Sequence, residues 1–214
     1  MDKNTYYRLY QEEIAKIRRE GRRPSLLLHV CCSVCACDLL TTLSDIFDIT
    51  IYYFNDNIYP EEEFEHRLAE VKRYLEWYHE NYAHPISLIV PAYDNANYME
   101  EMQPYLHLGE FTQRCWSCYE YRLIRAFAYA EENGYDYVAT VMSVSRYKNA
   151  VKINELGEKL QKIYPGVRYL YTDFKKDRGE ERSNALSKEL GLYRQPYCGC
   201  FSSLNEYRDR KKQK

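Results

Sequence analysis

The stretch Leu26-Leu27-Leu28-His29-Val30-Cys31-Cys32-Ser33-Val34-Cys35 decides the fold of this chain. Its first five residues form a short, mostly apolar run, which is typical of a strand that is buried on both faces. Two cysteines follow at once, and Leu39, Leu40 and Leu43 predict a helix behind them. The stretch therefore predicts a buried strand, a turn rich in thiols and a helix.

Similar apolar runs recur along the chain and alternate with segments of helical spacing. Further strands are predicted at 49–54, 86–90, 135–140 and 167–171, and helices at 5–20, 60–78, 115–132, 148–163 and 183–190. This alternation predicts an α/β fold in which a parallel sheet has helices on both faces. Residues 94–112 lack a clear period and are interpreted as an irregular insertion.

Composition sets the broad class and the division of the chain. The 214 residues are 45% hydrophobic and 29% charged, as in an ordinary folded protein. We predict an N-terminal helical extension at 1–24, a single α/β metal-binding catalytic domain at 25–204 and a basic tail at 205–214. A net charge of −2 means that any contact with nucleic acid needs a local basic face.

The cellular compartment is predicted from what the chain lacks. No apolar run approaches the roughly 20 residues that cross a bilayer, so no membrane partner is expected. The first residues are polar and do not resemble a signal peptide. We therefore expect a cytoplasmic location, in which thiols stay reduced and clustered cysteines bind metal or act in catalysis.

Eight cysteines fall in three tight groups. The groups are Cys31, Cys32, Cys35 and Cys37; Cys115 and Cys118; and Cys198 and Cys200. A C-x-x-C at the start of a helix points both thiolates to one side, where the helix dipole lowers their pKa. Gly199 permits the sharp bend that a C-x-C needs. Arg122 and Arg125 continue the stripe of the C-x-x-C and could offset the charge of an anionic cluster.

Two residues near the first group have a plainer interpretation. Cys37 lies on the predicted helix, where a small buried side chain is the expected role. His29 lies inside the predicted strand, so a hydrogen-bonded core histidine is expected, with a proton donor as the bolder alternative.

The residues alone leave three classes of function open. Soft sulfur ligands select iron–sulfur clusters or zinc. A structural zinc site needs only four thiolates. The additional cysteines therefore favour an iron–sulfur cluster, or a cluster with a second metal. The alternatives are a zinc-stabilised RNA-binding protein without redox activity and a thiol–disulfide oxidoreductase that uses the adjacent Cys31 and Cys32.

The chain resembles the QueH family of epoxyqueuosine reductases over roughly residues 25–204. The matching stretches are 27–35, Tyr53-Phe54-Asn55-Asp56-Asn57-Ile58-Tyr59-Pro60, 114–123, 143–148, 171–176 and Tyr193-Arg194-Gln195-Pro196-Tyr197-Cys198-Gly199-Cys200. Departures from the family pattern at Ser33-Val34, Arg146 and Cys37 remove no expected ligand.

The resemblance implies a Rossmann-like fold of the HUP or ATP-pyrophosphatase type. It also implies cobalamin-independent reduction of epoxyqueuosine to queuosine at the wobble position of tRNA, with electrons from an unidentified donor. A 4Fe-4S cluster and an additional mononuclear iron are the expected cofactors. A Ser-Gly-Gly-x-Asp-Ser loop does not follow the first strand, so ATP use is not expected.

The expected site residues follow from the matching motifs. The metal and cofactor ligands are Cys31, Cys32, Cys35, Cys115, Cys118, Cys198 and Cys200. Cys31, Cys32 and Asp173 are the expected catalytic residues, with Asp173 a candidate ligand of the second metal. Spacing does not assign cysteines to the cluster or to the additional iron.

The expected contacts with tRNA are basic residues in loops at the carboxyl edge of the sheet. They are Arg146, Lys148, Lys175, Lys176 and Arg194. Tyr147, Tyr193 and Tyr197 are candidates for stacking on unpaired bases, with local packing as the alternative.

Overall fold

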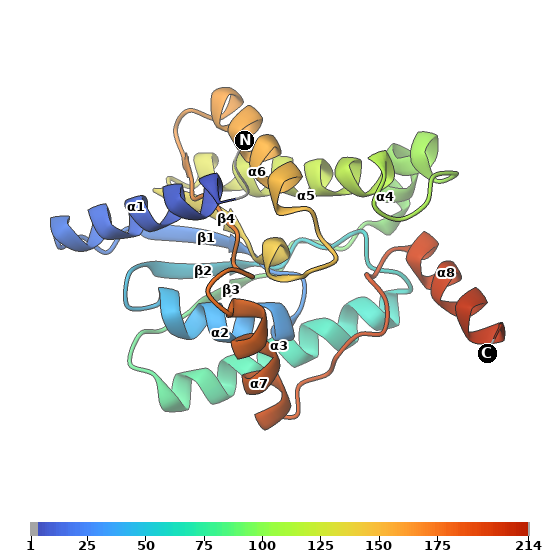
Figure 1. Cartoon of the computed structure of the whole chain (residues 1–214), viewed down its shortest axis with the longest axis horizontal. Coiled ribbons are helices and arrows are strands. Elements are labelled where there is room, and N and C mark those ends of the chain that lie inside the picture. The colour runs from blue at the N-terminus through green and yellow to red at the C-terminus, as the bar shows by residue number, and fades with distance from the viewer. Residues whose placement is uncertain (1–3, 214) are drawn as a thin grey trace.

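A computed structural model describes residues 4–213 as a five-stranded parallel sheet between two layers of helices (Figure 1). The strands are β1 (Ser25–His29), β2 (Asp48–Tyr52), β3 (Ser87–Ile89), β4 (Tyr137–Thr140) and β5 (Arg168–Tyr169). Their order is β3-β2-β1-β4-β5, and every neighbouring pair is parallel. The predicted α/β, Rossmann-like fold class is confirmed.

The central strand β1 has to be apolar at nearly every position because both of its faces are covered. Leu26 and Leu28 belong to one core cluster and Leu27 to the other, and all three are fully buried. Successive side chains of a strand point to opposite faces of the sheet. The continuous apolar run is thus explained by burial of the strand against two cores, one on each face of the sheet.

Two layers of helices supply these cores, and Figure 1 shows them on opposite sides of the sheet. The first core receives side chains from α1 (Thr5–Glu20), α2 (Ser33–Leu43), α3 (Glu61–Asn81) and α7 (Gly179–Glu189). The second receives them from α4 (Asn95–Met102), α5 (Gln113–Glu132) and α6 (Ala150–Ile163). Two short 3-10 helices, η1 (Gln103–Tyr105) and η2 (Val141–Val144), and a final helix, α8 (Phe201–Lys212), complete the fold.

Helix α4 lies inside the segment that we interpreted as irregular, so that interpretation is wrong over 95–102. The Asp94 side chain accepts a hydrogen bond from the Asn97 backbone N–H at 3.0 Å and caps the helix. Tyr98 and Met102, one turn apart, are buried. Two apolar positions and one cap are too weak a pattern to find in the sequence.

Helix α8 takes up most of the segment that we described as a basic tail. Residues 205–212 continue the helix that begins at Phe201, whereas residue 214 lies outside the described residues. Leu204 is buried, and Glu206 accepts a hydrogen bond from the Arg114 guanidinium at 2.8 Å. The helix therefore packs against the start of α5.

The topology places a binding crevice at one edge of the sheet. The strand order changes direction between β1 and β4, and ligands of doubly wound sheets bind beyond the carboxyl ends of the strands at such a switch point. Cys31 follows β1 there, and η2 follows β4. The first cysteine group thus lies where this topology places ligands.

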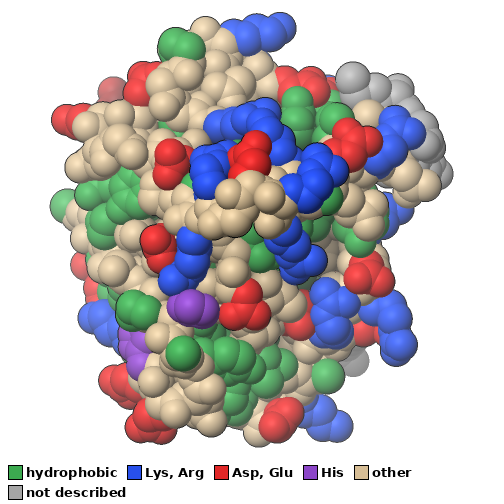
Figure 2. Space-filling model, turned by 90° about the vertical axis from the view of Figure 1, so that its left-hand side faces the viewer, with side chains coloured by type: hydrophobic (Ala, Val, Ile, Leu, Met, Phe, Trp, Pro, Cys, Tyr) green, Lys and Arg blue, Asp and Glu red, His purple; other side chains and the backbone are tan. Residues whose placement is uncertain are grey.

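The opposite end of the sheet, where α1 ends, carries Lys and Arg side chains with acidic side chains between them (Figure 2). At this end Arg22 pairs with Glu20 at 2.6 Å and Arg23 with Asp48 at 3.0 Å. This basic face lies at the far end of β1 from Cys31. None of the helices in residues 4–213 has the length and hydropathy needed to span a bilayer.

Candidate metal centre

The first cysteine group forms a compact cluster between β1 and α2. The sulfur atoms of Cys31, Cys32 and Cys35 all lie within 4.8 Å of one another. Cys32 is the N-cap of α2 and Cys35 lies in its first turn, so the group lies at the positive end of a helix dipole. Such an arrangement stabilises thiolates and suits a metal ion.

Hydrogen bonds within this group distribute the protons unequally. Those from Cys32 and Cys35 hold the pKa of the Cys31 thiol well below its usual value, against the effect of burial. The hydrogen bond to Cys31 raises the pKa of Cys32 to about 11. Hydrogen bonds to Cys31 and Cys32 raise the pKa of Cys35. The group therefore favours one thiolate, at Cys31, and two thiols. A bound metal cation would neutralise this negative charge.

Lys148 belongs to this centre. Its ammonium Nζ lies 3.9 Å from the Cys31 sulfur. Burial opposes the ammonium charge, but the Cys31 and Cys198 thiolates outweigh burial and raise the pKa of Lys148. We predicted Lys148 as a contact to tRNA, and that remains a prediction; in the structure its ammonium lies beside the Cys31 thiol.

The other four cysteines come from α5 and from the segment before α8. Cys115 and Cys118 lie in the first two turns of α5, and Cys198 and Cys200 immediately precede α8. Burial raises the pKa of Cys115, with further contributions from Cys198 and Cys118, while a backbone hydrogen bond from Phe111 opposes the shift. The pKa of Cys200 rises to about 12 through burial and then through Cys198 and Cys118. The C-x-x-C and the C-x-C are therefore close enough to interact electrostatically.

The two groups differ in compactness. In the described part of the chain, only Cys31, Cys32 and Cys35 meet the 4.8 Å spacing of a preformed metal site. Of the eight cysteines, all described, Cys198 is the exposed one. The structure thus divides the seven predicted ligands into a buried set of three and a looser set of four that opens toward solvent.

Arg67 on α3 positions the C-x-C, and no motif in the sequence pointed to it. Its guanidinium donates to the carbonyl oxygens of Cys198 at 3.1 Å and Tyr197 at 3.3 Å, and it pairs with Glu63 at 2.8 Å. Gly199 has a φ of +131° and packs under the same guanidinium. A buried arginine and a glycine together hold the bend that carries Cys198 and Cys200.

Replacing Gly199 by alanine should therefore disturb both the fold and the metal site. A Cβ would lie 3.1 Å from Arg67 Nη1 and 3.2 Å from Ile58 Cγ1, in a backbone conformation that favours glycine. We expect Gly199→Ala to lower the free energy of unfolding by about 1–3 kcal/mol and to weaken metal binding. Thermal unfolding and metal analysis measure the two effects.

Gly191→Ala is the matched control, because its φ is +57° but nothing lies within 4 Å of the added Cβ. It should lose stability without losing bound metal. Full metal content in Gly199→Ala would show that the bend does not position the ligands.

Arg122 on α5 lies between the two groups. Its side chain is 1% exposed; Nε donates to the Cys118 carbonyl oxygen at 3.3 Å, and Nη2 has no hydrogen-bond partner within residues 4–213. Burial opposes its charge, but the thiolates of Cys118, Cys31 and Cys198 outweigh burial and raise its pKa. A buried cation with a free N–H group among thiols fits an anionic metal cluster.

The structure separates Arg122 from Arg125, which the sequence had placed on one stripe. Arg125 pairs with Glu101 at 2.9 Å and lies over the Tyr121 ring at 4.5 Å. Of these two arginines, only Arg122 therefore neutralises charge at the centre.

Arg114 and Tyr98 also support the second group without a clear signal in the sequence. Arg114 joins α5 to α8 through Glu206 and the Leu108 carbonyl oxygen, which brings the two cysteine pairs together. Tyr98 on α4 hydrogen-bonds the Cys118 thiol, and its pKa is raised by burial and by Cys118.

His29 and Cys37 have the structural roles expected of them. Nε2 of His29 donates to the Phe54 carbonyl oxygen at 3.1 Å, and Nδ1 accepts from the Thr140 hydroxyl at 2.8 Å. Burial and then Arg122 lower the pKa of His29 to about 3, so the ring stays neutral. Cys37 is buried, and its thiol donates to the carbonyl oxygens of Val34 and Ser183 at 3.5 Å.

Asp173 lies outside the compact cysteine group. Its Oδ1 is buried without a hydrogen bond, and the Lys175 ammonium lies 3.7 Å away. Burial raises the pKa of this carboxyl, and Lys175 and Lys176 oppose the shift. Lys175 also donates to the Lys148 carbonyl oxygen at 3.1 Å, which links Asp173 to the loop that carries Lys148.

The remaining basic residues that we predicted to contact tRNA have polar partners. Arg146 is exposed and pairs with Glu180 at 2.7 Å, Lys176 donates to the Asn4 side chain at 3.0 Å, and Arg194 contacts the Asn184 side chain. Tyr193 stacks on His66, and Tyr197 donates to the Tyr59 carbonyl oxygen and stacks on Tyr207. Tyr147 is 69% exposed.

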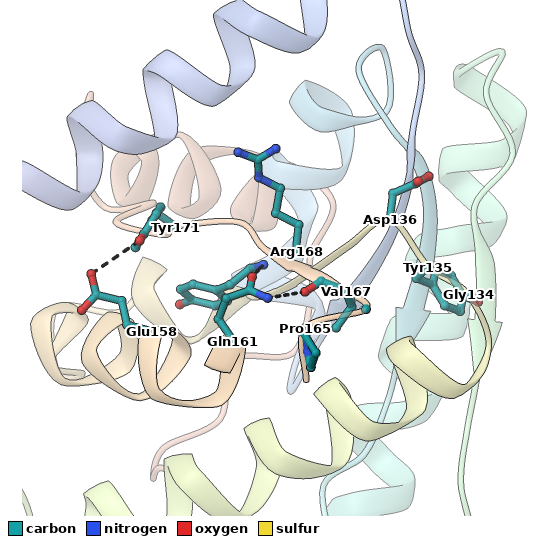
Figure 3. A pocket seen from close by; sticks show the side chains of 11 residues that line it. Gly134, Tyr135, Asp136, Glu158, Gln161, Pro165, Val167, Arg168 and Tyr171 are labelled. Atoms are coloured by element: carbon teal, nitrogen blue, oxygen red, sulfur yellow. Dashed lines mark hydrogen bonds between the residues drawn. The ribbon is translucent and has the colours of Figure 1, made fainter. Parts of the chain in front are cut away.

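A separate cavity of about 570 Å³ lies at the amino end of β4 and β5 (Figure 3). Asp136, Arg168 and Tyr171 line it, and Gln161 donates to the Val167 carbonyl oxygen at 2.6 Å across one side. None of the predicted site residues lines this cavity. The cavity therefore does not belong to the cysteine centre.

Comparison with known proteins gives one consistent result. A family model described as epoxyqueuosine reductase QueH matches residues 26–206. The epoxyqueuosine reductase QueH of Streptococcus pyogenes serotype M1 is 34% identical over 198 residues, which covers 92% of this chain and 77% of that protein. Those of Staphylococcus epidermidis and Thermotoga maritima are 35% and 32% identical, covering 95% and 87% of this chain and 87% and 93% of the respective relative.

Proposed function

The chain belongs to the epoxyqueuosine reductase QueH family and is an oxidoreductase, and on this premise we propose the reaction that it catalyses. It reduces epoxyqueuosine to queuosine at the wobble position of tRNA without cobalamin. The substrate takes up two electrons and two protons, and the epoxide oxygen leaves as water. An electron-donor protein supplies the electrons, and the reduced thiols suit a cytoplasmic location.

The observation that carries this proposal is the convergence of seven cysteines and two buried cations at one edge of the sheet. Three segments distant in sequence contribute the thiols, and Arg122 and Lys148 lie among them. A closed zinc site would need four of these thiols and would leave three without a role. A redox dithiol would use Cys31 and Cys32 and leave the set of four unexplained.

The donor set fits the two expected cofactors. We assign Cys115, Cys118, Cys198 and Cys200 to a 4Fe-4S cluster, because such a cluster takes four cysteine thiolates. Cys31, Cys32 and Cys35 would then hold the additional iron. When bound, these groups supply electrons one at a time and a Lewis acid for the epoxide oxygen.

The chain's own residues prepare the site for this chemistry. Arg122 and Lys148 offset the negative charge of the thiolates where little water is present to do so. Asp173 carries a buried carboxylate oxygen that accepts no hydrogen bond and lies 3.7 Å from the Lys175 ammonium, and it is the proposed carboxylate near the additional iron. His29 is excluded as the proton donor, because its ring is neutral and both ring nitrogens are engaged.

Contacts to the tRNA remain part of the proposal. Arg146, Lys175, Lys176 and Arg194 are the proposed phosphate contacts, each able to exchange a present partner for a phosphate. Cys198, the exposed cysteine, marks the side from which the nucleoside enters.

The test supplies iron-loaded protein, prepared without oxygen, with a reductant and tRNA that carries epoxyqueuosine. We expect conversion to queuosine in the absence of cobalamin. A colourless protein that binds zinc and RNA but leaves the epoxide intact would favour the zinc alternative. A protein that only reduces disulfides would favour the dithiol alternative.

A further inference from the structure

Exposed aromatic rings gather around the metal centre. In residues 4–213, the exposed aromatic side chains are Tyr59, Tyr82, Phe111, Tyr147 and Phe201. All except Tyr82 adjoin the cysteine centre in the chain or through hydrogen bonds. We call these four rings the aromatic rim.

Short connections join each member of the rim to the centre. Tyr147 directly precedes Lys148, and Phe201 directly follows Cys200. The Tyr59 backbone N–H donates to the Gly199 carbonyl oxygen at 2.8 Å, and its ring meets that of Phe201 edge to face at 5.3 Å. Phe111 lies four residues before Cys115, just ahead of α5. The four rim residues therefore lie next to the cysteine-bearing segments, on several different elements.

Phe111 and Tyr147 are the most exposed members of the rim, and Phe111 also has a strained backbone. Phe111 is 61% exposed and has a φ of +64°, a backbone conformation that bulky residues rarely adopt. Among the described residues neither Phe111 nor Tyr147 has an aromatic partner. A strained and exposed phenylalanine beside a metal ligand is unfavourable for the free protein, which suggests that the ring serves a ligand.

We propose that the aromatic rim stacks on the unpaired bases that flank the modified nucleoside in the anticodon loop. This inference rests on the proposed function, which makes tRNA the substrate. Aromatic faces accept any base, and single-stranded loops expose their bases for such stacking. Separate exposed rings suit individual bases, because each base can stack on one aromatic face.

The charges beside the rim indicate where the RNA backbone runs. Arg146 directly precedes Tyr147, and α8 leads away from Phe201 through Arg208, Arg210, Lys211 and Lys212. Glu61, Glu62 and Glu65 line a cavity at the start of α3, just after Tyr59. Phosphates would avoid those carboxylates, so we place the strand on the side of Tyr147 and α8.

Binding of a synthetic RNA hairpin to iron-loaded protein tests the rim without requiring turnover. The hairpin carries an anticodon loop with unmodified guanine at the wobble position, and a duplex of the same length is the comparison. We expect Phe111→Leu and Tyr147→Leu each to weaken hairpin binding about tenfold, since leucine is apolar but cannot stack. Binding of the duplex should change little.

Two further variants separate stacking from folding. Tyr82→Leu is the matched control, because this exposed ring lies beyond the far end of α3, about 30 Å along the helix from its start. It should leave hairpin affinity unchanged. Phe111→Gly relieves the positive φ, so its unfolding temperature should not fall although its hairpin affinity does.

Each contrary outcome has a distinct meaning. Unchanged hairpin affinity in Phe111→Leu and Tyr147→Leu would overturn the rim and leave the reductase proposal intact if wild type converts epoxyqueuosine. An equal loss in Tyr82→Leu would also overturn it. If wild type fails to convert epoxyqueuosine but the rim variants lose hairpin binding, the proposed reaction fails and the RNA surface stands.

A protein occupant of the rim is the other outcome of the test. In that case the rim variants would bind the hairpin normally. They would turn over normally with dithionite and slowly with a flavodoxin or ferredoxin as electron donor. That result would overturn the stacking proposal and assign the rim to the donor.

Discussion

Serine variants of the seven cysteines are expected to lose turnover and to divide into two classes by iron content. Cys118→Ser and Cys200→Ser should lose the visible absorption of the 4Fe-4S cluster, because serine is a poor replacement for a soft thiolate ligand. Cys31→Ser and Cys32→Ser should keep that absorption and lose only the additional iron, because they belong to the separate buried set of three. Iron and sulfide analysis with absorption spectra measures the division.

Cys37→Ser is the control for these variants. Cys37 is equally buried, but its thiol only contacts the carbonyl oxygens of Val34 and Ser183. Its iron content and most of its activity should remain. Normal iron and turnover in Cys118→Ser, or loss of the cluster absorption in Cys31→Ser, would show that the two sets do not bind separate groups.

Replacement of Arg122 by methionine is expected to change the stability of the loaded and metal-free proteins in opposite directions. In the loaded protein the guanidinium neutralises thiolates, and its loss should weaken iron binding about 10- to 100-fold. In the metal-free protein Nη2 is buried without a partner, so an apolar side chain of similar length should preserve or raise the unfolding temperature. Thermal unfolding with and without iron, together with iron titration, measures both effects.

Two variants complete this experiment. Arg125→Met removes a cation from the same helix, but its ion pair with Glu101 is partly exposed and worth at most about 1 kcal/mol, so iron binding should not change. Arg122→Lys keeps the charge and should recover part of the iron affinity. If Arg122→Met destabilises both forms equally, the arginine serves only the packing of α5.

The sheet, and the position of the first cysteine group at its carboxyl edge, could be predicted because both follow from local sequence patterns. The apolar run at Leu26–Leu28 requires burial on two faces, and the turn after it must lie at the carboxyl edge of a parallel sheet. The seven ligand candidates follow from motifs that place each cysteine pair on one side of a helix or a turn.

Contacts between distant segments could not be predicted in the same way. Arg67 holds the C-x-C across 131 residues of chain, and no local spacing marks it. The sequence showed Lys148 only as a loop cation, whereas folding directs its ammonium to Cys31. The division of the cysteines into sets of three and four likewise depends on how α5 and α8 pack, through Arg114 and Glu206.

Mass analysis of nucleosides from treated tRNA decides whether the protein removes the epoxide oxygen. Iron-loaded, chemically reduced protein is incubated with tRNA carrying epoxyqueuosine and no cobalamin, and the tRNA is then digested. We expect queuosine, lighter by one oxygen atom, with wild type and Cys37→Ser and none with Cys118→Ser. Intact epoxyqueuosine after incubation with wild-type protein that retains its full iron content and bleaches on reduction would show that the proposed reaction is wrong.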